Sequence, residues 1–81
     1  GSKNSSTVGV DEILRKAIIL KASALVVAHN HPSDDVQPSN KDIELTNKLY
    51  NASKLVGIPL LDHLIIGKSS HFSFKNNSML E

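Results

Sequence analysis

The sequence contains no cysteine, and aromatic residues make up only 4% of its 81 residues. The absence of cysteine excludes a disulfide scaffold, a thiolate metal site and a cysteine nucleophile. So few aromatic residues cannot form a base-stacking platform for nucleic acid. The 9 Lys and Arg and the 8 Asp and Glu are scattered, without the clustered basic face that binds phosphates. We therefore expect no direct nucleic-acid binding by this chain.

A long apolar run is also absent. The longest, Ala24–Ala28, is far too short to cross a bilayer, and nothing at the N-terminus reads as a signal peptide. We therefore expect no membrane partner and a cytoplasmic location. Hydrophobic residues at 40% and charged residues at 21% are typical of a soluble globular domain. The length allows one small domain with a thin core.

The first half of the chain predicts a loop, a helix and a strand. Residues 1–9, rich in Ser, Asn and Gly, predict an N-terminal loop or the remnant of a tag, and residues 10–81 a single domain. Apolar residues recur at the spacing of one helix face, which predicts a helix over 11–21. Ala24–Ala28 is continuously apolar, which predicts a strand buried on both faces of a sheet with helices on each side.

The second half predicts a helix followed by a hairpin. Ser39-Asn40-Lys41-Asp42 has the form of a capping box, so a helix should begin at Ser39 and stop at Gly57. Leu60–Ile66 and Phe72–Phe74 are short β-type runs separated by Gly67 and a polar turn. The order helix–strand–helix–strand–strand predicts a layered α/β domain.

Residues that carry chemistry follow the predicted strand directly. His29 and His31 are two apart, so in a strand their imidazoles point to the same face, at the strand end where α/β sheets place their sites. The next loop can bring Asp42, in the first turn of the following helix, back over that end. Two imidazoles and one carboxylate, with a fourth position left for water, predict a zinc site of the catalytic type. Zinc would lower the pKa of that water and polarise a carbonyl.

Simpler interpretations exist for each part of this group. An isolated His-x-His pair is weak evidence for a metal, and Ser39 and Asp42 are fully explained by helix capping. The capping and metal interpretations are compatible, because Asp42 can give one oxygen to a metal and the other to a backbone N–H. The hydroxyl of Ser39 can likewise be aimed at a reacting oxygen.

The sequence resembles a known family through His29-Asn-His-Pro-Ser33, Pro38-Ser39-x-x-Asp42-Ile43, Thr46 and Asp62-His63-Leu-Ile-Ile-Gly67. These motifs are similar to the C-terminal part of the RadC family, within the JAMM (MPN+) metallopeptidase superfamily. The resemblance implies a three-layer α-β-α, cytidine-deaminase-like fold, here truncated at its N-terminus. It implies His29, His31 and Asp42 as zinc ligands and Ser39 as the residue that stabilises an oxyanion. The implied substrate is a peptide or isopeptide bond in a protein or peptide.

Two departures from the family pattern matter. Asp34 stands where the family usually has glycine, beside the expected metal. The superfamily's general base is a glutamate on an N-terminal strand, and no glutamate of this chain matches it: Glu12 and Glu44 fall in predicted helices and Glu81 is terminal. We therefore favour a fragment of a longer enzyme over a degenerate inactive member. The 81 residues alone should hydrolyse poorly or not at all.

Two other functions stay open. The chain could be an inactive binding module linked to DNA repair, recognising protein or DNA. It could also pair with another copy through a sheet edge left exposed by the missing strands. For Asp62 two alternatives stay open, orientation of a ligand histidine or a structural role in the strand turn.

Overall fold

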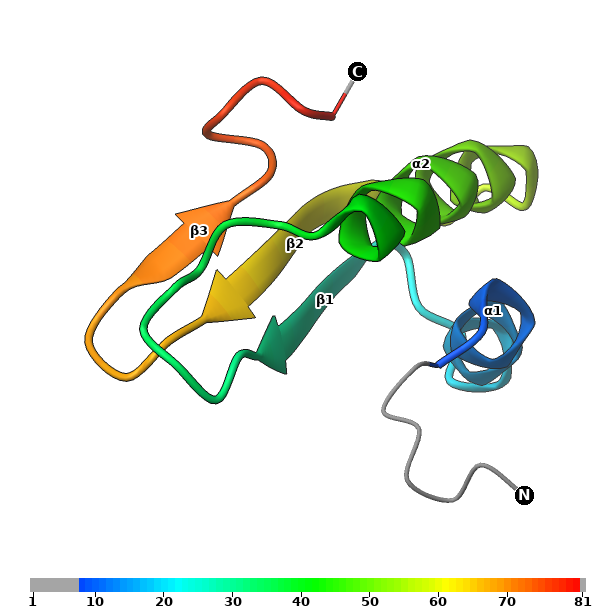
Figure 1. The fold of residues 1–81 in the computed structure, drawn as a ribbon. Coiled ribbons are helices and arrows are strands. Elements are labelled where there is room, and N and C mark those ends of the chain that lie inside the picture. The colour runs from blue at the N-terminus through cyan, green and yellow to red at the C-terminus, as the bar shows by residue number, and fades with distance from the viewer. Residues whose placement is uncertain (1–7, 81) are drawn as a thin grey trace.

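The structure is a computed structural model that describes residues 8–80. Its element order is the one predicted from the sequence (Figure 1). Of the expected N-terminal loop, residues 1–7 lie outside the described residues, and Val8 and Gly9 precede the first helix without regular structure. The elements are α1 (Val10–Ile19), β1 (Leu25–Asn30), α2 (Asn40–Leu55), β2 (Leu60–Ile66) and β3 (His71–Ser73).

Local signals define both helices. Helix α1 ends two residues before its predicted limit, because Lys21 takes a left-handed conformation with φ of 56° and turns the chain toward β1. At the start of α2, the N–H of Asp42 donates to Ser39 Oγ at 3.1 Å, and the N–H of Ser39 donates to Asp42 Oδ2 at 2.8 Å. The predicted capping box is therefore confirmed. Gly57, with φ of 79°, follows the C-terminus of α2.

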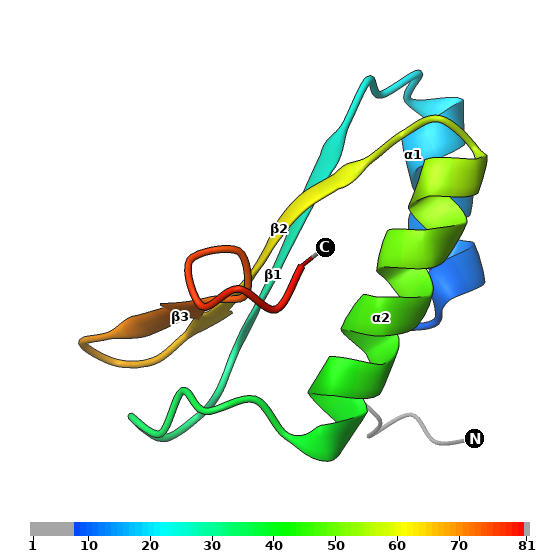
Figure 2. The same ribbon diagram turned by 90° about the horizontal axis from the view of Figure 1, so that it is seen from above.

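The three strands form one sheet in the order β1-β2-β3. β1 pairs in parallel with β2, and β2 pairs antiparallel with β3. Helix α2 lies over one face of this sheet, and α1 lies next to α2 (Figure 2) on the side of β1 (Figure 1). The core lies between α2 and the sheet. Its most buried members are Thr46, Leu49, Ser53, His63, Ile65 and Phe74.

The prediction that the first strand is buried on both faces is wrong for the described residues. Side chains of β1 alternate between half-buried and exposed, and Val26 is 53% exposed. The reason is that both helices lie on one side of the sheet, so residues 8–80 form two layers rather than the expected three. β1 also extends two residues beyond the predicted Ala28 and includes His29 and Asn30. In residues 8–80 no helix has the length and apolar character needed to span a bilayer.

The edge of the sheet at β1 carries a testable expectation. Within residues 8–80, β1 pairs with β2 alone and presents exposed Val26. An open edge of this kind is a template for pairing with another chain. We expect the 81-residue chain to self-associate there, and Val26→Lys to raise the dissociation constant by at least about tenfold, or about 1.4 kcal/mol.

Light scattering at several protein concentrations measures this directly. Leu55→Lys is the matched control, because Leu55 is 89% exposed but belongs to α2 rather than to the sheet. A chain that stays monomeric at every concentration, or equal effects of both substitutions, would contradict pairing at the edge.

Candidate metal centre

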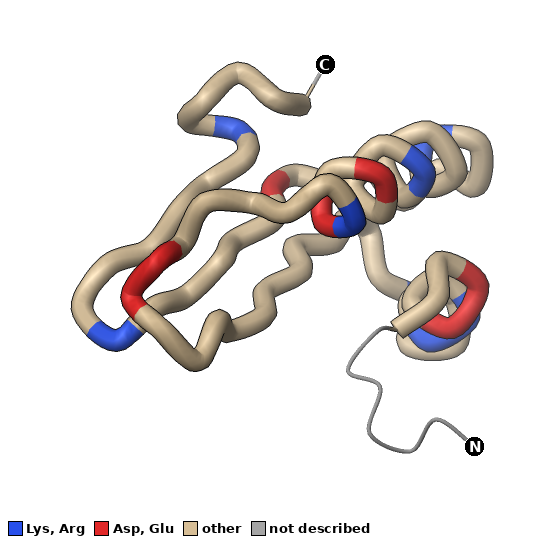
Figure 3. Tube along the Cα trace, in the orientation of Figure 1, with Lys and Arg blue, Asp and Glu red and all other residues tan. Residues whose placement is uncertain are grey.

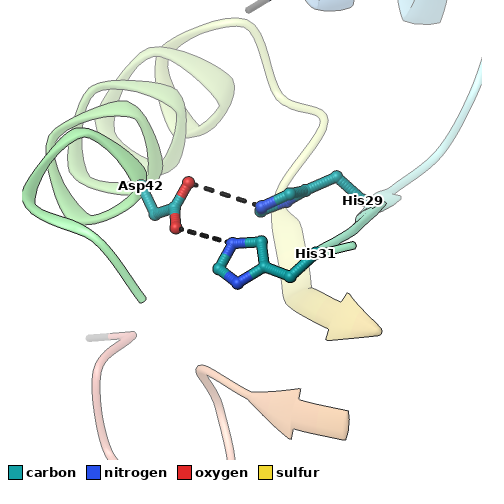
Figure 4. Close-up of side chains that lie close together, drawn as sticks. All are labelled: His29, His31 and Asp42. Atoms are coloured by element: carbon teal, nitrogen blue, oxygen red, sulfur yellow. Dashed lines mark ion pairs between the residues drawn. The ribbon is translucent and has the colours of Figure 1, made fainter. Parts of the chain in front are cut away.

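Three side chains from two neighbouring elements converge at the C-terminal end of β1. His29 lies in β1, His31 follows its end, and Asp42 lies in the first turn of α2. His29 Nε2 is 3.4 Å from Asp42 Oδ1, and His31 Nε2 is 3.4 Å from Asp42 Oδ2 (Figure 4). One potential ligand atom from each residue lies within 4.8 Å of the others. The structure thus brings together the three residues that the sequence predicted would converge.

Backbone geometry explains the convergence. The N–H of His31 donates to the carbonyl oxygen of Ile66 at 2.9 Å, which continues the β1–β2 pairing past Asn30. His29 and His31 therefore keep the alternation of a strand and present their rings on one side, with centroids 5.0 Å apart. The capping box fixes the first turn of α2 above them and aims Asp42 at both rings.

The Asp42 carboxylate serves both the helix cap and the two histidines. Oδ2 accepts from the N–H of Ser39 and also faces His31, whereas Oδ1 faces His29. Burial tends to raise the pKa of this carboxyl group, but hydrogen bonds from Ser39 and the nearby imidazoles outweigh it, and the pKa is lowered. Asp42 is therefore an anion at neutral pH, although its side chain is only 16% exposed.

A loop carbonyl fixes the orientation of His31. His31 Nδ1 lies 2.9 Å from the carbonyl oxygen of Asp35. Since a carbonyl can only accept, Nδ1 carries the proton, and the Nε2 of a neutral ring offers a lone pair toward Asp42. Ligand histidines in metal sites are usually held by such a bond.

Asp34, the departure from the family pattern, holds this loop in place. Its carboxylate accepts from the N–H of Ser69 at 2.9 Å and from the Ser69 hydroxyl at 3.1 Å. These two bonds lower the pKa of Asp34. The carboxylate therefore ties the loop after β1 to the turn between β2 and β3, and Asp34 serves the loop rather than the metal group.

A buried histidine, His63, contacts the Nδ1 atom of His29, on the side of the ring away from Asp42. His29 Nδ1 lies 3.0 Å from His63 Nε2, and His63 Nδ1 contacts the hydroxyl of Thr46. The His63 residue is 2% exposed, and its ring stacks on Phe74 with centroids 4.7 Å apart. Burial, and after it the neighbouring His29, lower the pKa of His63 to about 4. His63 is therefore neutral at neutral pH.

The support of His29 by His63 was missed by the sequence analysis, which assigned that role to Asp62 as one of two alternatives. Asp62 instead accepts from the N–H of His63 at 2.7 Å, from the Ser73 hydroxyl at 2.6 Å and from the N–H of Lys75 at 3.0 Å. Its role is the structural one, since it joins β2 to β3 and the following turn. The available signal was strand alternation, which places His63 and Ile65 on one face of β2.

The remaining predicted residues lie around the group. Ser39 is exposed at the helix cap beside Asp42. Glu12 and Glu44 are exposed and do not belong to the group, and Glu81 lies outside the described residues. A cavity of about 340 Å³ borders His29 and Asp42. Its other walls come from Val8, α1, β1, α2 and His63 of β2 and are mainly apolar, so a substrate can reach the group from this side.

The chemistry of the donor atoms fits a divalent ion. The Nε2 atoms of both imidazoles face an ionised carboxylate, and neutral rings with unprotonated Nε2 atoms would bring three acceptors together. A cation, or a proton on one of the rings, relieves the repulsion among them. Nitrogen and oxygen ligands of this kind suit Zn²⁺ and related transition metals.

Comparisons with known proteins identify the family of the chain. The sequence matches the family described as RadC-like JAB domain over residues 1–79. It is 51% identical over 80 residues to a UPF0758 protein of Protochlamydia amoebophila, covering 99% of this chain and 35% of that protein. It is 45% identical over 80 residues to a UPF0758 protein of Clostridium acetobutylicum, with the same coverage of 99% and 35%.

A UPF0758 protein of Bacillus pumilus is 46% identical over 80 residues, covering 99% of this chain and 36% of that protein. The chain thus spans about a third of the length of the curated relatives it matches. The match over residues 1–79 shows that the chain belongs to the RadC-like JAB domain family.

Proposed function

We propose that the chain is the metal-binding part of a zinc-dependent hydrolase that cleaves peptide or isopeptide bonds in a protein or peptide substrate. The observation that carries the proposal is the convergence of His29, His31 and Asp42. In both histidines Nδ1, the nitrogen that faces away from Asp42, already has a hydrogen-bond partner. Three protein ligands leave one coordination position open, as catalytic zinc sites do. When bound, zinc would supply Lewis-acid activation of water and of a substrate carbonyl.

The residues of this chain would then have distinct roles. His29, His31 and Asp42 hold the ion and supply one negative charge. The Ser39 hydroxyl accepts from the N–H of Asp42 in the cap and still carries one proton, which it can donate to a developing oxyanion. The neighbouring cavity with apolar walls would take part of the substrate.

A group that accepts the proton of the attacking water is required from elsewhere. In residues 8–80 neither glutamate joins the metal group. We propose that the rest of a longer protein, comparable in length to the relatives, supplies a glutamate, strands that pair with the open edge of β1, and a helix that covers the exposed face of the sheet. The complete protein would then have the three-layer JAMM fold. Adding that upstream region should create peptidase activity that the 81 residues lack.

Metal content tests the proposal. After incubation with Zn²⁺ and gel filtration, mass spectrometry should find one zinc per chain. His31→Ala should remove it, whereas His71→Ala, at an exposed histidine in β3, should not. A chain that holds no zinc under these conditions, or that holds as much after His31→Ala, would refute the metal site.

The rival function is an inactive binding module linked to DNA repair. The observation in its favour is the absence of a glutamate from the metal group within residues 8–80. The distribution of charge argues against DNA as the ligand, because Lys and Arg are interspersed with Asp and Glu along both helices (Figure 3). An affinity for duplex DNA that falls steeply with salt would support this rival.

A further inference from the structure

We propose that His63 and Thr46 are positioning residues that fix the tautomer of His29, so that His29 Nε2 presents a lone pair to the metal position. They do so through a series of hydrogen bonds that runs from the carbonyl oxygen of Asp42 through Thr46 and His63 to His29 Nδ1. The use of that lone pair for a metal rests on the proposed function. The assignment of the protons rests only on contacts within residues 8–80.

Within this series of hydrogen bonds, the Thr46 hydroxyl has a single proton to donate. Thr46 Oγ1 donates it to the carbonyl oxygen of Asp42 at 2.7 Å, one turn earlier in α2. Toward His63 Nδ1 the same oxygen can therefore only accept. His63 Nδ1 must carry a proton to complete this bond.

The surroundings of the His63 ring determine whether it is neutral or charged. Its ring is buried against Phe74, and neither of its nitrogens contacts a carboxylate. A charged imidazole in this position would be desolvated without an anionic partner, so the ring is neutral. With its proton on Nδ1, His63 offers a lone pair at Nε2.

The hydrogen bond between His63 and His29 determines which nitrogen of His29 carries the proton. His63 Nε2 accepts, so His29 Nδ1 at 3.0 Å must donate. The Nε2 of a neutral His29 is then unprotonated and faces Asp42 Oδ1 at 3.4 Å. The side-chain hydroxyl of Thr46, which touches neither His29 nor the metal position, thereby decides which nitrogen of His29 is free.

His31 reaches the same state by a separate route. Its Nδ1 proton goes to the carbonyl oxygen of Asp35, and no side chain relays it. A change at Thr46 should therefore alter His29 and leave His31 unchanged. This independence supplies an internal control within one site.

Thr46→Val and Thr46→Ser form a matched pair, because valine keeps the shape of threonine and serine keeps the hydroxyl. In Thr46→Val the Nδ1 proton of His63 is left buried without an acceptor, which is unfavourable. Moving the proton to His63 Nε2 relieves this and forces His29 Nδ1 to become the acceptor. The proton of His29 then sits on Nε2, where it competes with the metal.

The first readout is the ¹⁵N NMR spectrum of the imidazole rings in the metal-free chain. We expect the protonated nitrogen of His29 to be Nδ1 in the unmodified chain and in Thr46→Ser, and to shift toward Nε2 in Thr46→Val. His31 should keep its proton on Nδ1 in all three. The second readout is Zn²⁺ affinity in competition with a chromophoric chelator, which should fall about 10–100-fold in Thr46→Val and by less than about threefold in Thr46→Ser.

The outcomes separate this inference from the proposed function. An unmodified chain with the His29 proton on Nε2, or a folded Thr46→Val with unchanged tautomer and affinity, would overturn the inference. If Thr46→Val does not fold, the spectrum of the unmodified chain still decides it. A chain that shows the expected tautomers but binds no Zn²⁺ would refute the metal function and support the positioning role.

Discussion

Replacing Asp42 with asparagine should lower the affinity of the chain for Zn²⁺ by more than about 100-fold. The substitution keeps the size of the side chain and an oxygen that can accept from the N–H of Ser39 at the helix cap. Within residues 8–80, it removes the only negative charge that faces both imidazoles. Loss of a residue that merely orients a ligand costs about 10–100-fold in metal affinity, so loss of a ligand's charge should cost more.

Glu44→Gln is the matched control for this experiment. Glu44 lies on the same helix, two residues further, and its side chain is exposed and outside the metal group. Removing its charge should leave the affinity within about twofold, since an exposed charge is screened by solvent. Both variants are measured by competition with a chelator, with circular dichroism to compare the metal-free folds. Equal affinities for Asp42→Asn and Glu44→Gln would show that Asp42 is a helix cap and no ligand.

The convergence of these three residues could be predicted from the sequence, because each depends on a local rule. Alternation along a strand puts His29 and His31 on one face, and the capping box fixes Asp42 in the first turn of the helix. The loop between them is short enough for the chain to return over the strand end. These rules use neighbours within a few residues, which are visible in one sequence.

The support of His29 could not be predicted in the same way, because it depends on the register between two strands. His29 and His63 are 34 residues apart, and their contact requires β1 to pair with β2 in parallel, with the irregularity between Leu25 and Val26. A shift of the register would change which residue of β2 lies beside His29. The sequence indicated Asp62 as a candidate because it precedes His63, whereas the structure uses Asp62 to join β2 with β3.

The limits and burial of the first strand were wrong for a related reason. The apolar run ends at Ala28, but hydrogen bonding to β2 continues through Asn30 opposite Ile66. An apolar composition indicates that a strand can be buried, but it does not indicate which element covers the strand. Val26 is apolar like a core residue but is exposed, in line with the alternating burial of β1. Both helices in residues 8–80 lie on one side of the sheet.

His63 makes the metal-free fold sensitive to acid. Its pKa is about 4 in the folded chain, against an ordinary value of 6.5. Between these values the unfolded chain binds a proton that the folded chain does not, so the free energy of unfolding falls as the pH falls. The loss begins below about pH 6.5 and is complete near pH 4, where it amounts to about 3 kcal/mol. The groups that face or adjoin the His63 ring are His29, Thr46, Asp42, Asp62 and Phe74.

Urea unfolding at several pH values, with a chelator present, measures this loss, and His63→Gln is the control. Glutamine can accept from His29 and donate to Thr46 but stays neutral, so its stability should lack the fall between pH 6.5 and 4. The carboxyl groups of Asp42 and Asp62 have pKa values lowered from 3.8, so their contribution is lost only at lower pH and does not obscure the result. In the unmodified chain the His63 ring resonances should move only below about pH 5. Resonances that move near pH 6.5, together with parallel stability curves for the two chains, would mean that His63 accepts a proton in the folded state and does not hold His29 as a neutral ring.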